Sequence, residues 1–518
     1  MITVYGRAER DGENTVPGIA GQLARHARDT PERLFLTWYE ERLSYGEADA
    51  LVRGIAARLI AEDLANGRTG RIVIFLGNCP AAVIVWIAAQ AAGLVPVTLN
   101  REHRGEVLTD VVTRSDPSVL VCDAEGSELL SEAGVFAEYA AMIVGTTGIH
   151  DVSLLVTPEA LAISCIEPVP AAAPATVMFS SGTTGRSKGV VIPHGMFDAG
   201  PARLQEAWSV TADDVFHCWV PWFHVAAQQD VFALAIRAGA CVALVEGFSL
   251  SRFWDQIRQS GATVFGGFVT VLEMLYAQPP SPTDTQHRLR FGIAGHIPGA
   301  LKTRFEKRFG VPMVDAYGMS EAEPLTIPTL EPAVPLGSVG RENPDFELAV
   351  QDESGVNVAP GQEGQIVFKP VRPNVMMREY LDDPERSTAA WRNGWFLTGD
   401  LGFLDSSGNL FYRDRLSEFI RVRGENVSPQ EVESVLMSHP EIREVAVLGV
   451  AAELGEHDVV ALIVSNNSLE SEELREWCNG RMAKFMIPKC FIATDRIPRT
   501  PTSKVQRAAL AALLEQAS

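Results

Sequence analysis

The stretch TVMFSSGTTGRSKGVVIPH, residues 176–194, carries the strongest signal in the sequence. It predicts a strand over 176–179 and a second, β-branched strand from Val190, with a polar loop between them. The loop glycines permit turns that are closed to other residues, the hydroxyls donate hydrogen bonds, and Arg186 and Lys188 supply positive charge. The stretch therefore predicts a polyphosphate site. Its candidate binding residues are Ser180, Ser181, Gly182, Thr183, Thr184 and Gly185, and Lys188 is a candidate catalytic residue.

This loop differs from the commonest phosphate loop. The GxxxxGK[ST] pattern needs a glycine before the lysine and a hydroxyl after it, whereas Ser187 precedes Lys188 and Gly189 follows it. No dinucleotide-binding fingerprint fits the stretch either. Taken alone, the loop could be a Ser/Gly-rich surface turn, so motifs elsewhere in the chain have to decide between the two interpretations.

Length and composition indicate a globular protein with more than one domain. At 518 residues the chain exceeds one ordinary core, and its 46% hydrophobic and 21% charged content is not that of a disordered chain. The formal charge of −21 argues against a nucleic-acid partner. The seven cysteines lack metal-ligand spacing, and the N-terminal residues lack an apolar signal core. We therefore expect reduced thiols and a cytoplasmic protein.

One long apolar run, Ala81 to Leu99, has the length of a membrane span. Gln90, Gly93 and Pro96 interrupt the run. The sequence therefore predicts a buried helix that leads into a buried strand, and no contact with a membrane.

Helical and strand patterns alternate over residues 1–170, which favours an α/β fold with parallel sheets covered on both faces. Ligands of such sheets bind at the carboxyl ends of the strands, where the polar loop is expected. From Gly337 onward, short alternating segments with turn dipeptides predict a small antiparallel β subdomain. The last hundred or so residues again alternate helix and strand.

Two further motifs follow the phosphate loop. In VDAYGMSEAEP, residues 314–324, the Tyr317 ring can stack on adenine, the Ser320 hydroxyl can donate to an α-phosphate, and the Glu321 carboxylate can hold Mg²⁺ between phosphates. Gly318 lies between them. The loop begins about 130 residues after Lys188.

The second motif is NGWFLTGDLGFLDSSGNLFYRDR, residues 393–415. Here Asp400 can accept hydrogen bonds from a ribose diol, and Arg415 can add a cationic donor to the sugar or to phosphate. The alternative is a hairpin aspartate and a surface arginine, which ordinary turns often supply.

In this order the motifs resemble the signatures of the adenylate-forming superfamily, which includes acyl-CoA synthetases, freestanding adenylation domains and luciferases. YGMSE resembles the family's YGxTE, and PRTPTSK resembles PRTxxGK with Ser503 in place of glycine. The resemblance covers essentially the whole chain. It implies a large N-terminal domain over 1–414 with two α/β subdomains and a β subdomain, a hinge over 415–420, and a small mobile α+β domain over 421–518.

The resemblance also implies roles near the C-terminus. Lys504 matches the lysine that bridges the attacking carboxylate and the α-phosphate, although a lysine near a terminus is normally just solvated. Gly424 matches the loop that lines the pantetheine entrance in CoA ligases. Alternatively, this loop is an ordinary charged segment in contact with solvent. Ser417 stands in the hinge where relatives often carry Asp or Lys.

The substrate pocket is the part of the site that the sequence defines least. The resemblance places Trp222 and His224 in a wall between the acyl pocket and the thiol tunnel, with no acid–base role for His224. Gly267 leaves room for a ligand or forms a tight turn. His296 either narrows and polarises the acyl pocket or points away from it.

The resemblance implies an AMP-forming ligase that uses ATP and Mg²⁺, releases pyrophosphate and passes the adenylated group to a second nucleophile. Three segments are similar to the crotonobetaine/carnitine-CoA ligase type: SRFWDQIRQSGATV, QPPSPTDTQHRLR and RGENVS. This similarity implies a small polar or charged carboxylate as substrate and CoA as acceptor. Alternatives are a diazotase of bacterial secondary metabolism that adenylates nitrite and transfers it to an amine, a ligase that loads a carrier protein, and a catalytically silent nucleotide-binding regulator. A homodimer is compatible with the sequence.

Overall fold

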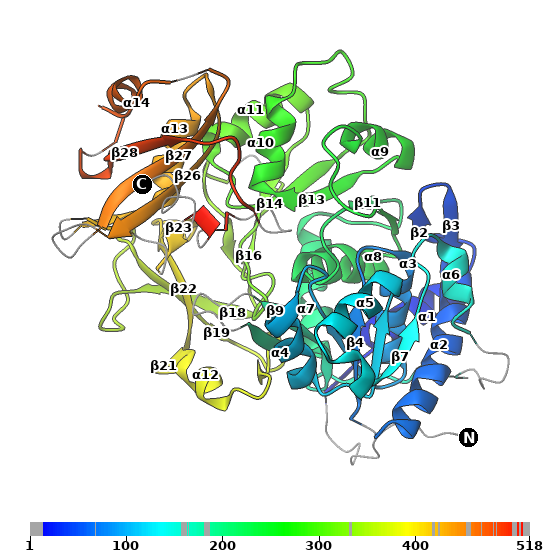
Figure 1. Ribbon diagram of the computed structural model, residues 1–518. Coiled ribbons are helices and arrows are strands. Elements are labelled where there is room, and N and C mark those ends of the chain that lie inside the picture. Colours follow the sequence, from blue (N-terminus) through cyan, green and yellow to red (C-terminus); the bar gives the residue numbers. More distant parts are fainter. Residues whose placement is uncertain are drawn as a thin grey trace.

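Two seven-stranded sheets form the larger part of the protein, as the computed structural model shows (Figure 1). The structure describes residues 14–67, 69–156, 163, 165–180, 187–330, 334–416, 420–422, 425–451, 457–467, 469–479, 481–482, 484–499, 505–506 and 509–510. Within these ranges the α/β fold class expected from the sequence is confirmed.

The first sheet contains the strands on either side of the polar loop. In sheet order its strands are β20 (Glu379–Tyr380), β10 (Lys188–Pro193), β9 (Pro174–Ser180), β5 (Val95–Thr98), β4 (Arg71–Phe75), β6 (Val119–Cys122) and β7 (Ala140–Ile143). The strands from β9 to β7 run parallel, and β10 is antiparallel to both β9 and β20. The polar loop thus follows the carboxyl end of a parallel strand, as expected.

The second sheet is parallel except at one edge. Its order is β15 (Met313–Asp315), β14 (Phe291–Gly295), β13 (Val264–Phe268), β11 (Val215–Cys218), β12 (Cys241–Leu244), β2 (Leu34–Trp38) and β3 (Glu41–Ser44). Only the β2–β3 pair at that edge is antiparallel. The loops after β14 and β15 carry His296 and Tyr317, so both residues leave the sheet at its carboxyl edge.

Helices cover both sheets, and their apolar side chains form one large cluster and a second, smaller one that contains Leu108, Val111 and Leu130. They are α1 (Gly18–Asp29), α2 (Tyr45–Ala65), α3 (Pro80–Ala91), α4 (Gly105–Ser115), α5 (Ala124–Glu132), α6 (Ile149–Ser153), α7 (His194–Ala207), the π-helix η2 (Ala226–Ala233), α8 (Leu234–Ala238), α9 (Phe253–Ser260), α10 (Val269–Ala277) and α11 (Gly299–Phe309). The long apolar run is confirmed as helix α3, buried from Pro80 to Gln90, followed by buried strand β5. Among the described helices none has the length and apolarity needed to cross a membrane.

The expected antiparallel subdomain is present. It consists of β18 (Phe346–Gln351), β19 (Gly364–Pro370), β21 (Trp391–Arg392), β22 (Trp395–Leu404) and β23 (Leu410–Arg415), with helix α12 (Pro384–Ala389) nearby. Two short antiparallel pairs lie outside the larger sheets. They are β1 (Thr15–Val16) with β8 (Val169–Pro170), and β16 (Thr326–Ile327) with β17 (Arg341–Glu342). The antiparallel hairpin of β22 and β23 sets Asp400 opposite Arg415.

The C-terminal residues form a separate unit, orange to red in Figure 1, with its own apolar core. Its sheet contains β26 (Ile442–Ala451), β27 (His457–Ser465) and β28 (Cys490–Ala493). Next to the sheet are α13 (Pro429–Met437), α14 (Ser471–Cys478), the 3-10 turn η3 (Lys484–Met486) and the pair β24 (Ile420–Val422) with β25 (Glu425–Val427). Strand β28 runs parallel to β27, and β26 is antiparallel to it. This α+β unit confirms the expected small C-terminal domain.

Candidate active site

Lys188, Glu321 and Tyr380 meet at the start of strand β10. The Lys188 ammonium forms an ion pair with Glu321 Oε1 and donates to the Tyr380 hydroxyl at 3.3 Å. The Tyr380 hydroxyl in turn donates to the same Oε1 at 2.7 Å. Glu321 is almost fully buried, its side chain being 3% exposed. A buried carboxylate that accepts from a cation and a hydroxyl is a stable arrangement, and it fixes the ammonium beside the phosphate loop.

Tyr380 reaches this corner because its two-residue strand joins the first sheet, with Tyr380 opposite Val190. Burial and the adjacent Glu321 carboxylate raise the pKa of Tyr380, so its hydroxyl stays protonated and acts as a donor. The sequence analysis missed this residue. A two-residue strand in MMREYLDDP has no periodicity, so no sequence signal was available.

Ser180 lies directly opposite Lys188 in the β9–β10 pairing. The Ser180 Oγ atom is buried and has no hydrogen-bond partner among the described residues. A buried hydroxyl without a partner is uncommon, and the residues that follow Ser180, 181–186, lie outside the described part of the chain. Ser320, next to Glu321 in the chain, is partly exposed.

Asp400, Arg415 and Tyr317 form a second polar group. Arg415 Nε lies 3.0 Å from Asp400 Oδ1, and the Tyr317 hydroxyl donates to Asp400 Oδ2 at 2.8 Å. Burial and the neighbouring carboxylate raise the pKa of Tyr317, so this hydroxyl also stays protonated. Tyr317 comes from the second sheet and Asp400 from the β subdomain, so the two motifs predicted to bind one nucleotide are in direct contact.

His296 lies with this second group. Its backbone has φ of +60°, and its N–H donates to Asp315 Oδ1 at 2.6 Å. The imidazole stacks on the Tyr412 ring with centroids 3.7 Å apart and lies 5.9 Å from the Tyr317 ring. Burial raises the pKa of Asp315 to about 7. The sequence left open whether the His296 ring enters the acyl pocket or points away from it. In the structure the ring lies between Tyr317 and Tyr412, beside Asp400.

The tryptophan beside Gly267 is Trp219 and not Trp222. The Trp219 ring lies over Gly267, where a Cβ atom would be 3.1 Å from Trp219 Cζ2, and it packs edge-on against Phe268. His224 also packs edge-on against Phe268, with ring centroids 5.4 Å apart. Gly267 is therefore small because a side chain covers it, and His224 lies in the same group.

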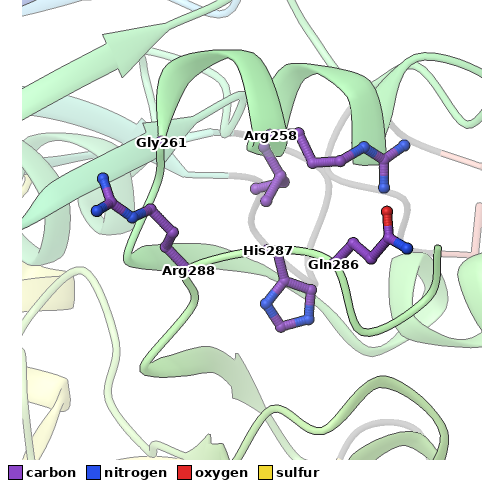
Figure 2. Close-up of a pocket in the computed structure, with 6 residues that line it drawn as sticks. Arg258, Gly261, Gln286, His287 and Arg288 are labelled. Atoms are coloured by element: carbon purple, nitrogen blue, oxygen red, sulfur yellow. The ribbon is translucent and has the colours of Figure 1, made fainter.

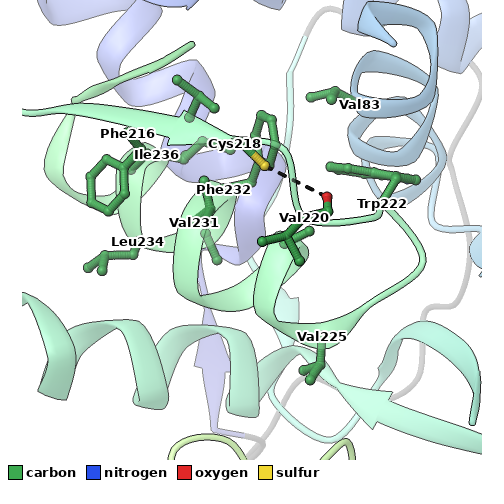
Figure 3. Close-up of a cluster of buried hydrophobic side chains, with 14 of the residues drawn as sticks. Val83, Phe216, Cys218, Val220, Trp222, Val225, Val231, Phe232, Leu234 and Ile236 are labelled. Atoms are coloured by element: carbon green, nitrogen blue, oxygen red, sulfur yellow. Dashed lines mark hydrogen bonds between the residues drawn. The ribbon is translucent and has the colours of Figure 1, made fainter. Parts of the chain in front are cut away.

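Trp222, by contrast, lies inside the core. Its side chain is 2% exposed and packs edge-on against Trp86 and Phe232. Figure 3 shows it in one buried cluster with Val83, Val220 and Phe232. The Trp222 backbone N–H donates to Asn78 Oδ1 at 2.7 Å, which anchors the start of the His224 segment.

Several predicted site residues lie outside the described part of the chain. These are Ser181, Gly182, Thr183, Thr184, Gly185, Gly424 and Lys504, together with Ser417 of the expected hinge.

A family model described as AMP-binding enzyme matches residues 23–381, and one described as AMP-binding enzyme C-terminal domain matches residues 431–504. The chain belongs to the AMP-binding enzyme family. The members of this family are AMP-forming ligases, so the protein is an enzyme of that class. The residues that meet in the two polar groups all fall within or just after the first matched range.

Similar members of the family are CoA ligases. Crotonobetaine/carnitine–CoA ligase of Salmonella typhi is 30% identical over 454 residues, which span 84% of this chain and 87% of that protein. The ATP-bound crystal structure of MatB from Rhodopseudomonas palustris superposes with a TM-score of 0.85 at 25% identity, covering 96% of this chain and 99% of that one. The apo form of MatB gives 0.74 over the same shares.

A third solved structure carries a metal. O-succinylbenzoate CoA synthetase (MenE) from Bacillus subtilis, in complex with ATP and a magnesium ion, has a TM-score of 0.82 at 28% identity and covers 95% of this chain and 99% of its own. In the described part of the present chain, no three His, Cys, Asp or Glu side chains are grouped to hold a metal. Mg²⁺ usually takes one or two carboxylates and completes its shell with phosphate oxygens and water, so the single Glu321 carboxylate fits an ion that arrives with ATP.

A cavity lies away from both polar groups. It has a volume of about 240 Å³ between the end of α9 and the loop before β14, and Figure 2 shows Arg258, Gln286, His287 and Arg288 around it. Arg258 is engaged by Asp255 at 2.6 Å, and both His287 ring nitrogens have backbone partners. All of its lining residues lie in the segments SRFWDQIRQSGATV and QPPSPTDTQHRLR, and none of them is a candidate catalytic or nucleotide-binding residue.

Proposed function

We propose that this enzyme is an ATP-dependent acid–CoA ligase for a small or polar carboxylic acid. A carboxylate oxygen attacks the α-phosphorus of ATP, the bond from that phosphorus to the bridging oxygen breaks, and pyrophosphate leaves. The CoA thiolate then attacks the acyl carbon of the adenylate, and AMP leaves. No covalent intermediate with the protein is needed, so the enzyme acts by positioning the reactants and by stabilising charge.

One observation carries this proposal: side chains from three subdomains form two adjoining polar groups suited to the two ends of a nucleotide. We assign Lys188 to the β- and γ-phosphates and Glu321 to the Mg²⁺ that arrives with them. We assign Asp400 and Arg415 to the ribose, and Tyr317 with Gly318 to the adenine.

The remaining roles follow the motifs. Ser320 donates to the α-phosphate, and Ser180 with the loop residues 181–185 surrounds the polyphosphate. Lys504 approaches from the C-terminal domain and stabilises the negative charge that builds up between carboxylate and α-phosphate. His224 and Gly267 line the acid pocket, His296 closes it toward the nucleotide, and the Gly424 loop admits CoA.

We infer further that the C-terminal domain, residues 421–518, moves on a hinge at 415–420 that follows the large domain ending at 414. The Asp414 carboxylate accepts from Ser428 Oγ at 2.7 Å, and Ser428 caps helix α13. The strand before the hinge is therefore attached to the first helix after it. The higher TM-score to ATP-bound MatB than to its apo form supports an arrangement suited to adenylation.

The test is ATP-dependent release of pyrophosphate and AMP over a panel of small carboxylic acids and nitrite, each with and without CoA. AMP turnover that needs both an acid and CoA is the expected result. Turnover with nitrite that ignores CoA and rises with an aryl amine would replace this proposal by the diazotase. Lys188→Ala should abolish turnover. Lys369→Ala should not, because it removes a lysine of β19 that pairs with Glu347 of β18.

A further inference from the structure

Arg114, in the last turn of helix α4, contacts the base of the phosphate loop, and the proposed mechanism gives it no role. Its Nη1 atom donates to the Ser187 carbonyl oxygen at 2.6 Å, and its Nη2 atom donates to the Leu381 carbonyl oxygen at 3.3 Å. The guanidinium also lies over the Phe179 ring, 5.2 Å from its centroid. One side chain thus joins strand β9, the residue before β10 and the segment that follows β20.

Each of these partners stands next to a residue of the candidate site in the chain. The adjacent pairs are Phe179 with Ser180, Ser187 with Lys188, and Leu381 with Tyr380. The Ser187 carbonyl belongs to the same planar peptide unit as the Lys188 N–H, so a hydrogen bond to that oxygen fixes the unit from which the Lys188 side chain starts. Arg114 therefore holds the backbone that sets Lys188 Nζ 3.3 Å from the Tyr380 hydroxyl.

The segments that Arg114 joins are also tightly packed against one another. A Cβ atom on Gly189 would lie 3.1 Å from Leu381 Cβ and 3.2 Å from Phe179 Cζ, so these two side chains press on the backbone of β10. The Leu381 N–H donates to the Gly189 carbonyl oxygen at 2.7 Å. Phe179 and Leu381 belong to the smaller apolar cluster, together with Val111 of α4. The carbonyl groups that Arg114 holds thus lie beside a packed junction.

Burial and shape suit Arg114 to this position. Its side chain is 12% exposed, so water screens its hydrogen bonds only weakly. Asp110, one turn earlier on α4, lies 3.3 Å from Nη1 and provides a counterion. The planar guanidinium can hold two carbonyl oxygens and face an aromatic ring at the same time. The ammonium of a lysine carries the same charge but lacks this fixed fork of donors.

We propose that Arg114 is a positioning residue for nucleotide binding, which fixes the peptide groups next to Lys188 and Tyr380 so that the Lys188 ammonium is in place before ATP arrives. A preorganised side chain loses less conformational freedom on binding, so removal of the fork should weaken nucleotide binding. An arginine with a structural role alone would change the unfolding temperature and leave nucleotide affinity unchanged in the folded protein. The inference rests on the proposed function only for the assignment of Lys188 to the phosphates.

The test measures nucleotide binding by four full-length proteins: wild type, Arg114→Lys, Lys188→Ala and the double variant. Each is titrated by calorimetry, below its unfolding transition, with Mg²⁺ and α,β-methylene ATP, in which the bond that adenylation breaks is blocked. Arg114→Lys keeps the charge and removes the fork, so we expect the Kd to rise about 10-fold. Because Arg114 acts through Lys188, the double variant should bind no more weakly than Lys188→Ala does.

Arg308→Lys is the matched control. Arg308, on helix α11, is 15% exposed and resembles Arg114 in its bonding. Its partners are the Asp284 carboxylate and the carbonyl oxygens of Tyr276, Gln278 and Pro279. This substitution should lower the unfolding temperature and leave the Kd for the nucleotide unchanged.

Three results would overturn the proposal. The first is a wild-type Kd in Arg114→Lys, and the second is an equal rise of the Kd in Arg114→Lys and Arg308→Lys. The third is a double variant in which the effects of Arg114→Lys and Lys188→Ala on the Kd multiply, because Arg114 would then act independently of Lys188.

The outcome is separable from the proposed function, because nucleotide binding requires neither an acid nor CoA. A protein whose Kd depends on Arg114 in the expected way, but which releases no pyrophosphate with any acid, keeps this positioning role and loses the ligase assignment. A protein that releases pyrophosphate with an acid and CoA, but whose Arg114→Lys variant binds the nucleotide as wild type does, keeps the ligase assignment and loses the positioning role.

Discussion

Replacing Tyr380 by phenylalanine removes one hydroxyl from the group that positions Lys188. That hydroxyl donates to Glu321 Oε1 at 2.7 Å and accepts from Lys188 at 3.3 Å. A hydrogen bond to a charged group contributes about 1.5–3 kcal/mol, and each 1.4 kcal/mol is a factor of about ten. If the bond is kept in the transition state, kcat/KM for ATP should fall by about 10- to 100-fold. The ring keeps its volume, so the fold should persist.

The assay is the initial rate of pyrophosphate release as a function of ATP concentration, with thermal unfolding of each variant measured alongside. Tyr39→Phe is the matched control, because Tyr39 is half exposed and its hydroxyl lies at the surface. Wild-type kcat/KM in Tyr380→Phe, together with an inactive Lys188→Ala, would refute the positioning role. A loss explained by a lower unfolding temperature alone would also count against it.

Three further results are expected. Trp222→Ala should lower the free energy of unfolding by about 3–5 kcal/mol in denaturant titrations, because the ring fills the core, and should barely change KM for the acid; normal stability with altered acid preference contradicts this. Lys504→Ala should suppress pyrophosphate release far more than it shifts the unfolding midpoint, and undiminished release rules out its catalytic role. The folded protein holds the Asp230 proton up to about pH 8, well above the ordinary pKa of an aspartate, so stability falls as pH rises through that window. Asp230→Asn should flatten this fall, and equal slopes in both proteins contradict it.

Much of the fold followed from periodicity and punctuation in the sequence. The run from Ala81 to Leu99 is too interrupted for a membrane span, and the structure has helix α3 and then strand β5 there. Turn dipeptides after Gly337 marked the antiparallel subdomain. Element ends were less predictable: β10 begins at Lys188, two residues before the β-branched stretch, because pairing with β9 extends the strand into the polar loop.

The candidate site, like the fold, was predicted from the sequence only in part. Lys188, Glu321, Asp400 and Arg415 belong to motifs with fixed local spacing, and the structure brings Lys188 to Glu321 and Arg415 to Asp400. An aromatic residue next to His224 gave no indication of which way its ring points, and Trp222 turned out to face the core. Tyr380 depends on a pairing between distant segments, which periodicity does not reveal.

The two-residue strand β20 also has a consequence for synthesis of the chain on the ribosome. It completes the edge of the first sheet by pairing with β10, with Val190 opposite Tyr380 and Val191 opposite Glu379. The nascent polypeptide must therefore extend past residue 380 before β10 is covered. Until then β10 exposes an unpaired strand edge, a surface that invites wrong pairing. Emergence of residues 379–380 is thus the step that completes the first sheet and joins Tyr380 to Lys188 and Glu321.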